Sequence, residues 1–415
     1  MQIYLVGGAV RDELLGIEVG DRDFCVTGAT TENMLSQGYS CVGKDFPVFL
    51  HPKTHEEYAL ARTERKNGHG YTGFICDFSP TITIEEDLLR RDLTINAIAK
   101  DVNGKIIDPT NGITDLKNKV LRHIGEAFSE DPLRVLRLAR FYAKLYNLGF
   151  CVADETMMLC KKISKSGELK HLTAERVWIE TEKALKTDNP EIYFIFLKNC
   201  YALEQVMPEI NNLVNIPQEI EFHPEGDAFN HTMLTLKIIS SLTKSPEKRF
   251  SMLVHDIGKT NTPTDILPKH TDHRERGKPL IKNFCKRLHV PNQYSDLAQK
   301  ICLCHNYVDL LLEPAETIEK TINIMDGYRN PNNISALAQC LTADYRGRTS
   351  YEKGLFTENY NIIYIFSKAK AISTKPIVAL GLKGIEIKQE LTKRRIAAIQ
   401  KAQSELQSLW VNFKL

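Results

Sequence analysis

Two acidic side chains stand one residue apart in VGDRDFCV (19–26), a stretch with the composition of a strand. Side chains alternate between the two faces of a strand, so Asp21 and Asp23 are predicted to point the same way. Carboxylates held this close repel each other unless a cation lies between them. Mg²⁺ prefers oxygen ligands and commonly bridges protein to substrate phosphates. The pair therefore predicts magnesium-dependent chemistry at a phosphate, with a solvated turn as the alternative.

A glycine pair and an arginine precede these acids. Gly7 and Gly8 in LVGGAVRDELLG follow a predicted strand and precede a predicted helix. Successive glycines allow a tight turn that points N–H groups at an anion, and a helix N-terminus adds positive potential. Arg11, one turn into the helix, would add a fork of donors for phosphate. Most glycine pairs simply make turns, so the nearby acids are what favour a phosphate site.

A site of this kind often needs a third acid. Glu64, at the end of the predicted strand EYALARTE, is the candidate, and an exposed strand end is the alternative. The loop that follows, RKNGHGYTGF (65–74), holds three glycines and is predicted to move over a bound substrate.

Three arginines recur at every third position of EDPLRVLRLARF (130–141), which is predicted to be helical. Arg134, Arg137 and Arg140 would form one slanted ridge on the helix, and they should be meeting anions because like charges repel. Intrahelical pairing or solvation is the alternative. Asp131 and Arg134 lie three residues apart, so their acceptors and donors could together read the edge of one base. The opposite face is predicted to enter the core through Leu133, Val135, Leu136, Leu138 and Phe141.

The second half of the chain is rich in histidine. SMLVHDIGKT contains the pair His255–Asp256 inside an apolar run, where burial would require a partner. Imidazoles and a carboxylate that converge from several helices suit a divalent transition metal such as Ni²⁺, Mn²⁺ or Co²⁺, which activates water for phosphate hydrolysis. Surface and helix-cap roles are the alternative. The histidines that could join the pair are His231, His270, His273 and His305, whereas His223 is expected to be structural.

Composition indicates an ordinary globular protein. The chain has 415 residues, of which 42% are hydrophobic and 26% charged, and its formal net charge is only +2, so a nucleic-acid partner would have to be met by local basic patches. Ten cysteines without a paired framework suggest a reduced protein. The beginning of the sequence lacks a signal-peptide pattern and no stretch is apolar enough for a membrane span, so we expect a cytoplasmic protein, monomeric or homodimeric.

The predicted organisation is an α+β fold, with a mixed α/β head followed by mostly helical segments. Residues 1–125 alternate short β-rich runs with turns and short helices. From about residue 126 the hydrophobic spacing becomes helical, and VNIPQEIEFHPEGD (214–227) is the best internal boundary. We predict a catalytic head at 1–125, a helical neck and body at 126–220, a histidine-containing domain at 228–329 and a helical C-terminal segment at 330–415. The runs predicted as strands are 3–6, 23–27, 46–51, 57–63 and 105–109.

The order of several motifs resembles a known family. GGAVRD, DRDF, RRDLTINA, DPTNG and EDPLRVLRLARF look like the successive motifs of class II CCA-adding tRNA nucleotidyltransferases, which belong to the polymerase-β-like superfamily. The likeness continues through LTAERVW into an HD-type segment and RRIAAIQ, so it covers nearly the whole chain. In the extent of this likeness, the chain is similar to the multifunctional CCA proteins of γ-proteobacteria.

The resemblance implies an activity, in which C, C and A are added from CTP and ATP to the tRNA 3′ end without a nucleic-acid template. By motif position, Asp21 and Asp23 would hold Mg²⁺, and Asp131 and Arg134 would read the base. Glu175 and Arg176 belong to a further motif and would support the helix that reads the base. The HD segment implies phosphatase, 2′-nucleotidase and 2′,3′-cyclic phosphodiesterase activities. The metal would be Ni²⁺, and its ligands would be His231, His255, Asp256 and His305. Asp309 is a candidate for the final acid of the HD pattern. Contacts to ATP or CTP would come from Gly8, Arg11, Arg91, Arg137 and Arg140.

Three alternatives stay open from the sequence. Poly(A) polymerases share much of the head pattern and would make a long A tail instead. An HD phosphohydrolase could use the head only to bind nucleotide. A non-catalytic tRNA-binding protein is disfavoured because binding alone does not need the acid pair. The Lys/Arg-rich segment 382–401 is predicted either to contact tRNA phosphates or to form a solvated helix.

Overall fold

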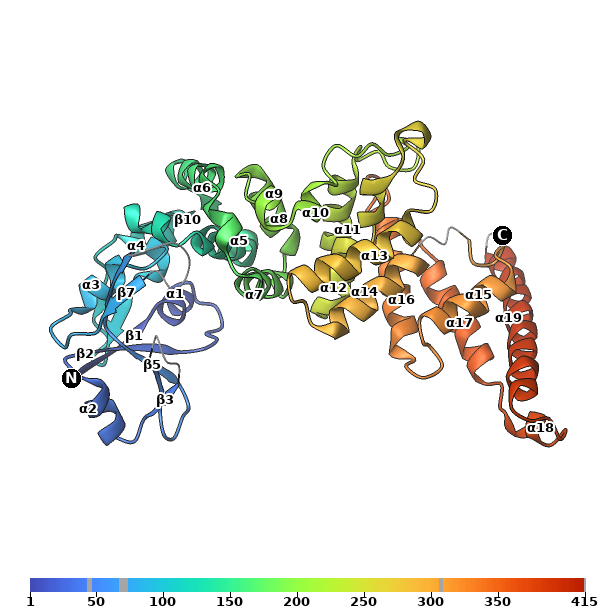
Figure 1. The fold of residues 1–415 in the computed structure, drawn as a ribbon, viewed down its shortest axis with the longest axis horizontal. Helices are drawn as coiled ribbons and strands as arrows, with labels where there is room; N and C mark the ends of the chain where they lie inside the picture. Colours follow the sequence, from blue (N-terminus) through green and yellow to red (C-terminus); the bar gives the residue numbers. More distant parts are fainter. Residues whose placement is uncertain (43–46, 67–73, 306–308, 414–415) are drawn as a thin grey trace. The chain divides into compact units, whose positions relative to one another are not determined.

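The computed structural model describes residues 1–415 apart from 43–46, 67–73, 306–308 and 414–415 (Figure 1). The chain divides into two compact units. The first comprises residues 1–184 and 192–206, and the second comprises residues 185–191 and 207–415. The first unit contains the β-sheet and the second is helical, which confirms the predicted α+β class. Within the described residues, no helix is both long enough and apolar enough to cross a bilayer.

A seven-stranded sheet forms the centre of the head, in the order β3-β4-β5-β2-β1-β8-β9. Strands β2 and β5 run parallel, whereas the other described neighbours are antiparallel. A separate hairpin pairs β6 with β7, and a short parallel pair joins β10 to β11. The strands are β1 Gln2–Val6, β2 Asp23–Thr27, β3 Ser40–Val42, β4 Val48–Leu50, β5 Glu57–Leu60, β6 Thr63–Lys66, β7 Phe74–Asp77, β8 Ala99–Asp101, β9 Ile106–Ile107, β10 Val120–Leu121 and β11 Cys151–Val152.

Two helices of the first unit begin at capping boxes. Thr83 and Glu86 form a reciprocal capping box at the start of α3, and Thr30 does the same with Asn33 at α2. Helix α5 buries its apolar positions and carries the arginines of the predicted ridge. The helices are α1 Gly8–Leu14, α2 Thr31–Ser36, α3 Ile84–Leu89, α4 Gly112–Asn118, α5 Leu133–Leu145, α6 Asp154–Ser166, α7 Ala174–Leu185, α8 Pro190–Asn199 and α9 Leu203–Val206.

The second unit is a stack of helices around an aromatic and aliphatic core. Phe250 of α12 stacks on Phe284 of α13 and meets Tyr294 of α14 edge to face. Side chains of Asp227 and Ser245 cap α11 and α12. The helices are α10 Pro208–Asn211, α11 Ala228–Leu242, α12 Pro246–Val254, α13 His273–Arg287, α14 Asn292–Cys304, α15 Ala315–Ile324, α16 Asn332–Arg346, α17 Glu358–Lys370, α18 Lys375–Val378 and α19 Ile385–Phe413.

Two local expectations were wrong. The predicted strand at 57–63 is two strands in two different sheets, because the chain leaves the main sheet after Leu60 and re-enters a strand at Thr63. Asp21 lies before β2 and not within it, since β2 begins at Asp23. The alternation of a single strand therefore does not govern the placement of this acid pair.

Candidate active site and metal centre

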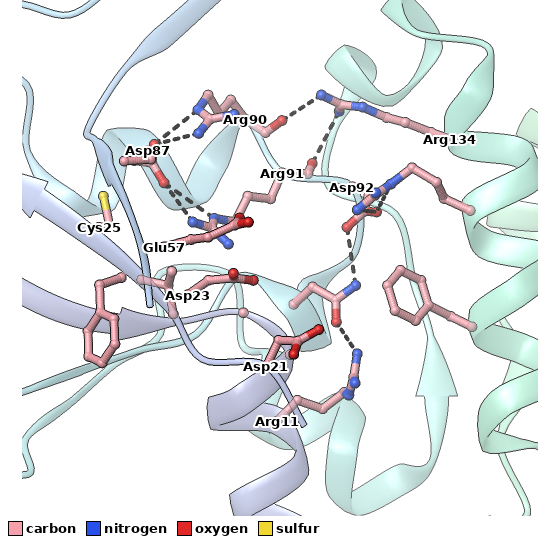
Figure 2. A pocket seen from close by; sticks show the side chains of 18 of the residues that line it. Arg11, Asp21, Asp23, Cys25, Glu57, Asp87, Arg90, Arg91, Asp92 and Arg134 are labelled. Atoms are coloured by element: carbon pink, nitrogen blue, oxygen red, sulfur yellow. Dashed lines mark hydrogen bonds and ion pairs between the residues drawn. The ribbon is translucent and has the colours of Figure 1, made fainter. Parts of the chain in front are cut away.

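A cavity of about 750 Å³ lies in the first unit, between the sheet and helices α1, α3 and α5 (Figure 2). This volume falls in the range typical of small-molecule sites. Its charged lining consists of Arg11, Asp12, Asp21, Asp23, Glu57, Arg62, Asp87, Arg90, Arg91, Asp92, Asp131, Arg134, Arg137, Arg140, Lys144 and Arg176. Gly8 also lines it, so the residues predicted from the sequence to contact the nucleotide share one cavity. Their roles in binding stay predictions.

Three carboxylates lie together at one side of this cavity. Asp23 and Glu57 are register partners in the parallel strands β2 and β5. Figure 2 shows the carboxylates of Asp21, Asp23 and Glu57 turned toward the same space. Burial raises the pKa of Asp23 above its usual value, and the negative charge of Glu57 raises it further. Sequence reasoning missed Glu57 because the pairing of β2 with β5 is a long-range feature of the sheet.

Glu64, the predicted third acid, lies in β6, in a different sheet from Asp23. Its side chain and the loop residues 67–73 lie outside the described part of the structure. The assignment of Glu64 as a catalytic acid therefore stays a prediction, whereas Glu57 has an observed place in the cavity.

A buried aspartate fixes two of the cavity's arginines. One oxygen of Asp87 lies 2.6 Å from Nη2 of Arg90, and the other lies 3.0 Å from Nη2 of Arg91. Burial alone would raise the pKa of Asp87, but the two guanidinium groups outweigh it and lower the pKa to about 2. The ionised carboxylate of Asp87 thus holds Arg91 close to the carboxylate of Asp23 (Figure 2).

The other cavity cations are fixed in a similar way. Arg137 lies 2.8 Å from the buried carboxylate of Asp92, and Arg140 lies 2.5 Å from Glu180. Arg11 is 2% exposed and donates to Asp12 and Asn96, the latter over 2.6 Å. Arg137 and Arg140 of the predicted ridge therefore meet anions, and these are carboxylates from other elements and not Glu130 or Asp131.

A glycine, Gly7, and an aromatic ring, that of Phe141, also line the cavity. Gly7 adopts φ +70, and a Cβ there would lie 3.0 Å from Nη1 of Arg91, so a larger residue would be strained and crowded. Phe141 is buried, as the sequence predicted, but it packs against the arginines instead of lying on the opposite face of the helix. Its ring lies 4.2 Å from the guanidinium carbon of Arg140 and 5.2 Å from that of Arg11, in favourable cation–π range.

The predicted base-reading residues are engaged elsewhere in this structure. Asp131 accepts from Nη2 of Arg176 over 2.8 Å and from the backbone N–H of Leu133. Arg134 is 9% exposed and donates to the backbone carbonyls of Arg90 and Arg91 (Figure 2). Asp131 and Arg134 both border the cavity. A base in the cavity would meet both residues only after some of these bonds are exchanged.

The second unit brings four predicted metal ligands into one buried cluster. His231 is fully buried between two carboxylates, with Nδ1 2.8 Å from Glu225 and Nε2 2.9 Å from Asp344. His255 Nε2 lies 3.4 Å from Asp256 Oδ2 and 3.7 Å from Asp344 Oδ1. We call His231, His255, Asp256, His273, His305 and Asp344 the histidine cluster.

The final acid of this cluster is Asp344 of α16. Asp309, the candidate from the sequence, instead accepts from the backbone N–H of Leu311. His270 also lies outside the cluster, bonded to Thr262 and the carbonyl of Pro217. Asp344 is almost 90 positions downstream of His255, so spacing alone could not single it out. In the structure Asp344 is only 8% exposed, which is unusual for an acidic residue.

The donor sets of the two sites suit different metals. In the histidine cluster, the ligand atoms of His231, His255 and Asp256 lie within 4.8 Å of one another, as do those of Asp256, His273 and His305. Among the described residues, the buried atoms Nε2 of His255 and Oδ1 of Asp256 have no hydrogen-bond partner. Such a set fits a divalent transition metal. The ligands around Asp23 are carboxylate oxygens alone, which fits Mg²⁺, because this ion takes one or two carboxylates and completes its shell with phosphates and water.

Three family matches cover much of the chain. Residues 3–122 match the poly A polymerase head domain, and residues 149–213 match the family described as "Probable RNA and SrmB- binding site of polymerase A". Residues 228–342 match the HD domain. The domain boundaries predicted at 125, 220 and 329 stay predictions.

The fold is that of solved CCA-adding enzymes. The Bacillus stearothermophilus CCA-adding enzyme in complex with CTP is 22% identical with a TM-score of 0.62, covering 96% of this chain and 89% of that one. A CCA-adding enzyme in its apo form II is 20% identical with a TM-score of 0.64, covering 99% and 92%. A tRNA nucleotidyltransferase solved with a primer tRNA and an ATP analogue is 22% identical with a TM-score of 0.54, covering 82% and 91%. The chain therefore carries a nucleotidyltransferase head of the poly(A) polymerase type, the RNA-binding region of that polymerase and an HD domain, in the fold of the CCA-adding enzymes.

Proposed function

We propose that this protein adds C, C and A from CTP and ATP to the 3′ end of tRNA, in tRNA maturation and repair. The observation that carries the proposal is one cavity that holds three carboxylates, at Asp21, Asp23 and Glu57, and a set of arginines fixed by buried acids. This combination suits a nucleoside triphosphate with a bound metal, because the phosphates need cations and the metal needs oxygen ligands.

The chain's own residues would act mainly by positioning. Asp21, Asp23 and Glu57 would hold Mg²⁺, which supplies charge neutralisation at the attacking 3′ hydroxyl and the leaving pyrophosphate. Arg91, Arg137 and other fixed arginines would bind the triphosphate, and they need little reorganisation because Asp87 and Asp92 already orient them. Gly7 leaves the space through which Arg91 approaches.

Nucleotide choice would come from Asp131 and Arg134. CTP and ATP would satisfy their acceptors and donors, whereas GTP or UTP would leave buried polar groups unpaired. Because Asp131 is paired with Arg176, binding of the correct base would replace one set of bonds with another. Arg176 would then be a positioning residue that holds Asp131 at the cavity wall.

A second activity is proposed for the HD domain, a metal-dependent hydrolysis of phosphate esters such as 2′,3′-cyclic nucleotides. The buried histidine cluster supports it, with the unpartnered Nε2 of His255 and Oδ1 of Asp256 as the observation. His231, His255, Asp256 and Asp344 would hold the metal, with His305 as a further predicted ligand, and Ni²⁺ is the ion proposed. A cytoplasmic location is part of the same proposal and rests on the sequence.

Sequencing of product ends tests the transferase directly. The full chain is incubated with Mg²⁺, all four NTPs and a tRNA that lacks its terminal CCA. We expect ends that read CCA and stop, and no product from the Asp21→Ala/Asp23→Ala variant. A long A tail would identify a poly(A) polymerase. No addition together with phosphodiesterase activity would favour the HD hydrolase with a nucleotide-binding head, and binding without either reaction would favour a tRNA-binding protein.

A further inference from the structure

Helix α5 carries a fourth cation, Lys144, beyond the three arginines of the predicted ridge. Lys144 follows Arg140 by four positions and Arg137 by seven, so it lies on the same side of the helix as these arginines. Among the described residues that line the cavity of the first unit, Lys144 is the only lysine. One side of α5 therefore presents a row of positive side chains to the cavity, and its last member has no role in the function proposed above.

The row has a direction along the helix axis. A helix rises about 1.5 Å per residue, so the Cα of Lys144 lies about 15 Å along the axis from the Cα of Arg134, with the other two arginines between them. Figure 2 shows Arg134 at the top of the view and Arg11 at the bottom. Arg11 and Lys144 contact the same carboxylate, that of Asp12, so Lys144 lies at the Arg11 end. The row thus runs from the predicted base-reading residues to the opposite end of the cavity.

A buried acid holds the two cations at that end. Nζ of Lys144 lies 2.9 Å from Oδ2 of Asp12, and Nη2 of Arg11 lies 2.7 Å from Oδ1. Asp12 is 4% exposed, so its carboxylate is a fixed anchor and not a solvated surface acid. Two cations with one acid leave a net positive charge in this group of three. Both cations can donate charge-assisted hydrogen bonds to a phosphate.

Lys144 differs from the arginines in its freedom to move. Its side chain is 40% exposed, whereas those of Arg11 and Arg140 are 2% and 14% exposed. An ammonium on a flexible four-carbon stem can turn from a carboxylate to a phosphate, whereas a buried guanidinium fork is held in one orientation. Such a side chain suits the part of a nucleotide that arrives and leaves through the open end of a site.

We propose that Lys144 binds the terminal phosphate of CTP or ATP, beside Arg11, while the base lies at the Arg134 end of α5. The inference deepens the nucleotidyl transfer proposed above and rests on it. In that transfer the tRNA 3′ oxygen bonds to the α-phosphorus and its proton passes to solvent. The bond from the α-phosphorus to the bridging oxygen breaks, and its electron pair leaves with pyrophosphate. Lys144 neutralises part of the charge on this leaving group, and Asp12 is a positioning residue.

Binding of nucleotides that differ only in phosphate number tests the assignment. The full chain is titrated with CTP, CDP and CMP in the presence of Mg²⁺ and without tRNA, as wild type and as Lys144→Met. We expect CTP to bind about tenfold more weakly to the variant, because one charge-assisted hydrogen bond is lost, and CDP and CMP to change by less than about twofold. Equal weakening of all three nucleotides, or unchanged CTP binding, would overturn the proposal.

Two further variants separate charge from packing. Lys144→Arg keeps a positive charge and should retain the affinity for CTP within about threefold. Lys100→Met is the matched control, because Lys100 forms an ion pair with Glu13 of α1 and does not line the cavity. It should bind all three nucleotides as the wild type does. Loss of CTP affinity in Lys100→Met equal to that in Lys144→Met would overturn the assignment to the terminal phosphate.

Inhibition by pyrophosphate reads the same contact from the product side. With tRNA that lacks its terminal CCA, the pyrophosphate concentration that halves CTP addition should rise about tenfold in Lys144→Met. CCA addition by the wild type with unchanged pyrophosphate inhibition in the variant would overturn the role of Lys144 and leave the proposed function in place. A selective loss of CTP binding in Lys144→Met, with no nucleotide addition by the wild type, would keep the phosphate site and overturn the proposed transferase.

Discussion

Asp23 and Glu57 begin two neighbouring parallel strands and are register partners, so the sheet fixes their carboxylates at the same side of the cavity. The cost of this arrangement appears in the raised pKa of Asp23, which burial and the charge of Glu57 both produce. A structure that keeps two acids together at such a cost is well suited to hold a cation between them.

Removal of the Glu57 charge tests whether it acts with the acid pair. Glu57→Gln should raise the Mg²⁺ concentration needed for half-maximal CTP addition and lower the rate by at least about tenfold, because one charged oxygen ligand is lost. Glu56→Gln is the matched control, since Glu56 does not line the cavity. Equal Mg²⁺ dependence in the Glu57→Gln variant and the wild type would exclude a role in metal binding.

Asp131→Ala should loosen nucleotide choice while some transfer remains. Under the proposed function the carboxylate supplies acceptors to the base and does not hold the metal, so we expect incorporation of GTP and UTP relative to CTP and ATP to rise about 5- to 100-fold, equivalent to about 1–3 kcal/mol. Competition assays with all four nucleotides measure this ratio. Glu126→Ala, at an exposed position of the preceding turn, should leave it unchanged. Unaltered fidelity in Asp131→Ala would mean that the base is read elsewhere.

The Asp87 ion pairs should make the head's stability depend on pH. The pKa of Asp87 is lowered from 3.8 to about 2 because Arg90 and Arg91 favour the charged form against the effect of burial. A lowered pKa in the folded state stabilises the fold above pH 4 or so, by about 2 kcal/mol, and this stabilisation is lost as the pH falls toward about 2.

Asp87→Asn therefore should lower the first thermal transition of the full chain near neutral pH, and the difference from wild type should shrink as the pH is lowered below about 4. Differential scanning calorimetry across that range measures it. Glu85→Gln, on the exposed side of the same helical turn, is the control. A difference that is independent of pH would show that packing, and not the ion pairs, accounts for the loss.

The two activities should separate by substitution. His255→Ala removes a buried donor of the histidine cluster, so hydrolysis of 2′,3′-cyclic AMP should fall by at least about a hundredfold, as expected when a metal site is lost. CCA addition should stay within about twofold of wild type, because the candidate transferase residues lie in the other unit. Loss of nucleotide addition in a folded His255→Ala protein would contradict separate sites.

Much of the head could be predicted from its motifs. The resemblance of its motifs to a known family, together with the spacing of the acid pair and of the arginines, identified Gly8, Arg11, Asp21, Asp23, Arg91, Asp131, Arg134, Arg137 and Arg140, and the fold places them around one cavity. The α+β class was also predictable, because the switch from short β-rich runs to helical spacing is visible in the hydrophobic pattern.

Long-range pairings were not predictable. Glu57 faces Asp23 only because β5 lies parallel to β2, and Asp344 reaches His231 only because α16 packs against α11. The acids that orient the arginines, such as Asp87 and Asp92, look like ordinary helix charges in the sequence, and only their burial distinguishes them. Phe141 is buried as predicted, but it lies four positions after Arg137 and therefore shares the face of the helix that carries this arginine.

The most direct test of the account is a crystal structure of the full chain with CTP and Mn²⁺, in which anomalous scattering locates the ion. The account predicts manganese within about 2.0–2.3 Å of carboxylate oxygens of Asp21 and Asp23 and of the triphosphate, with Arg91 and Arg137 on the phosphates. Bound CTP with those carboxylates directed into solvent, and no ion beside them, would contradict it.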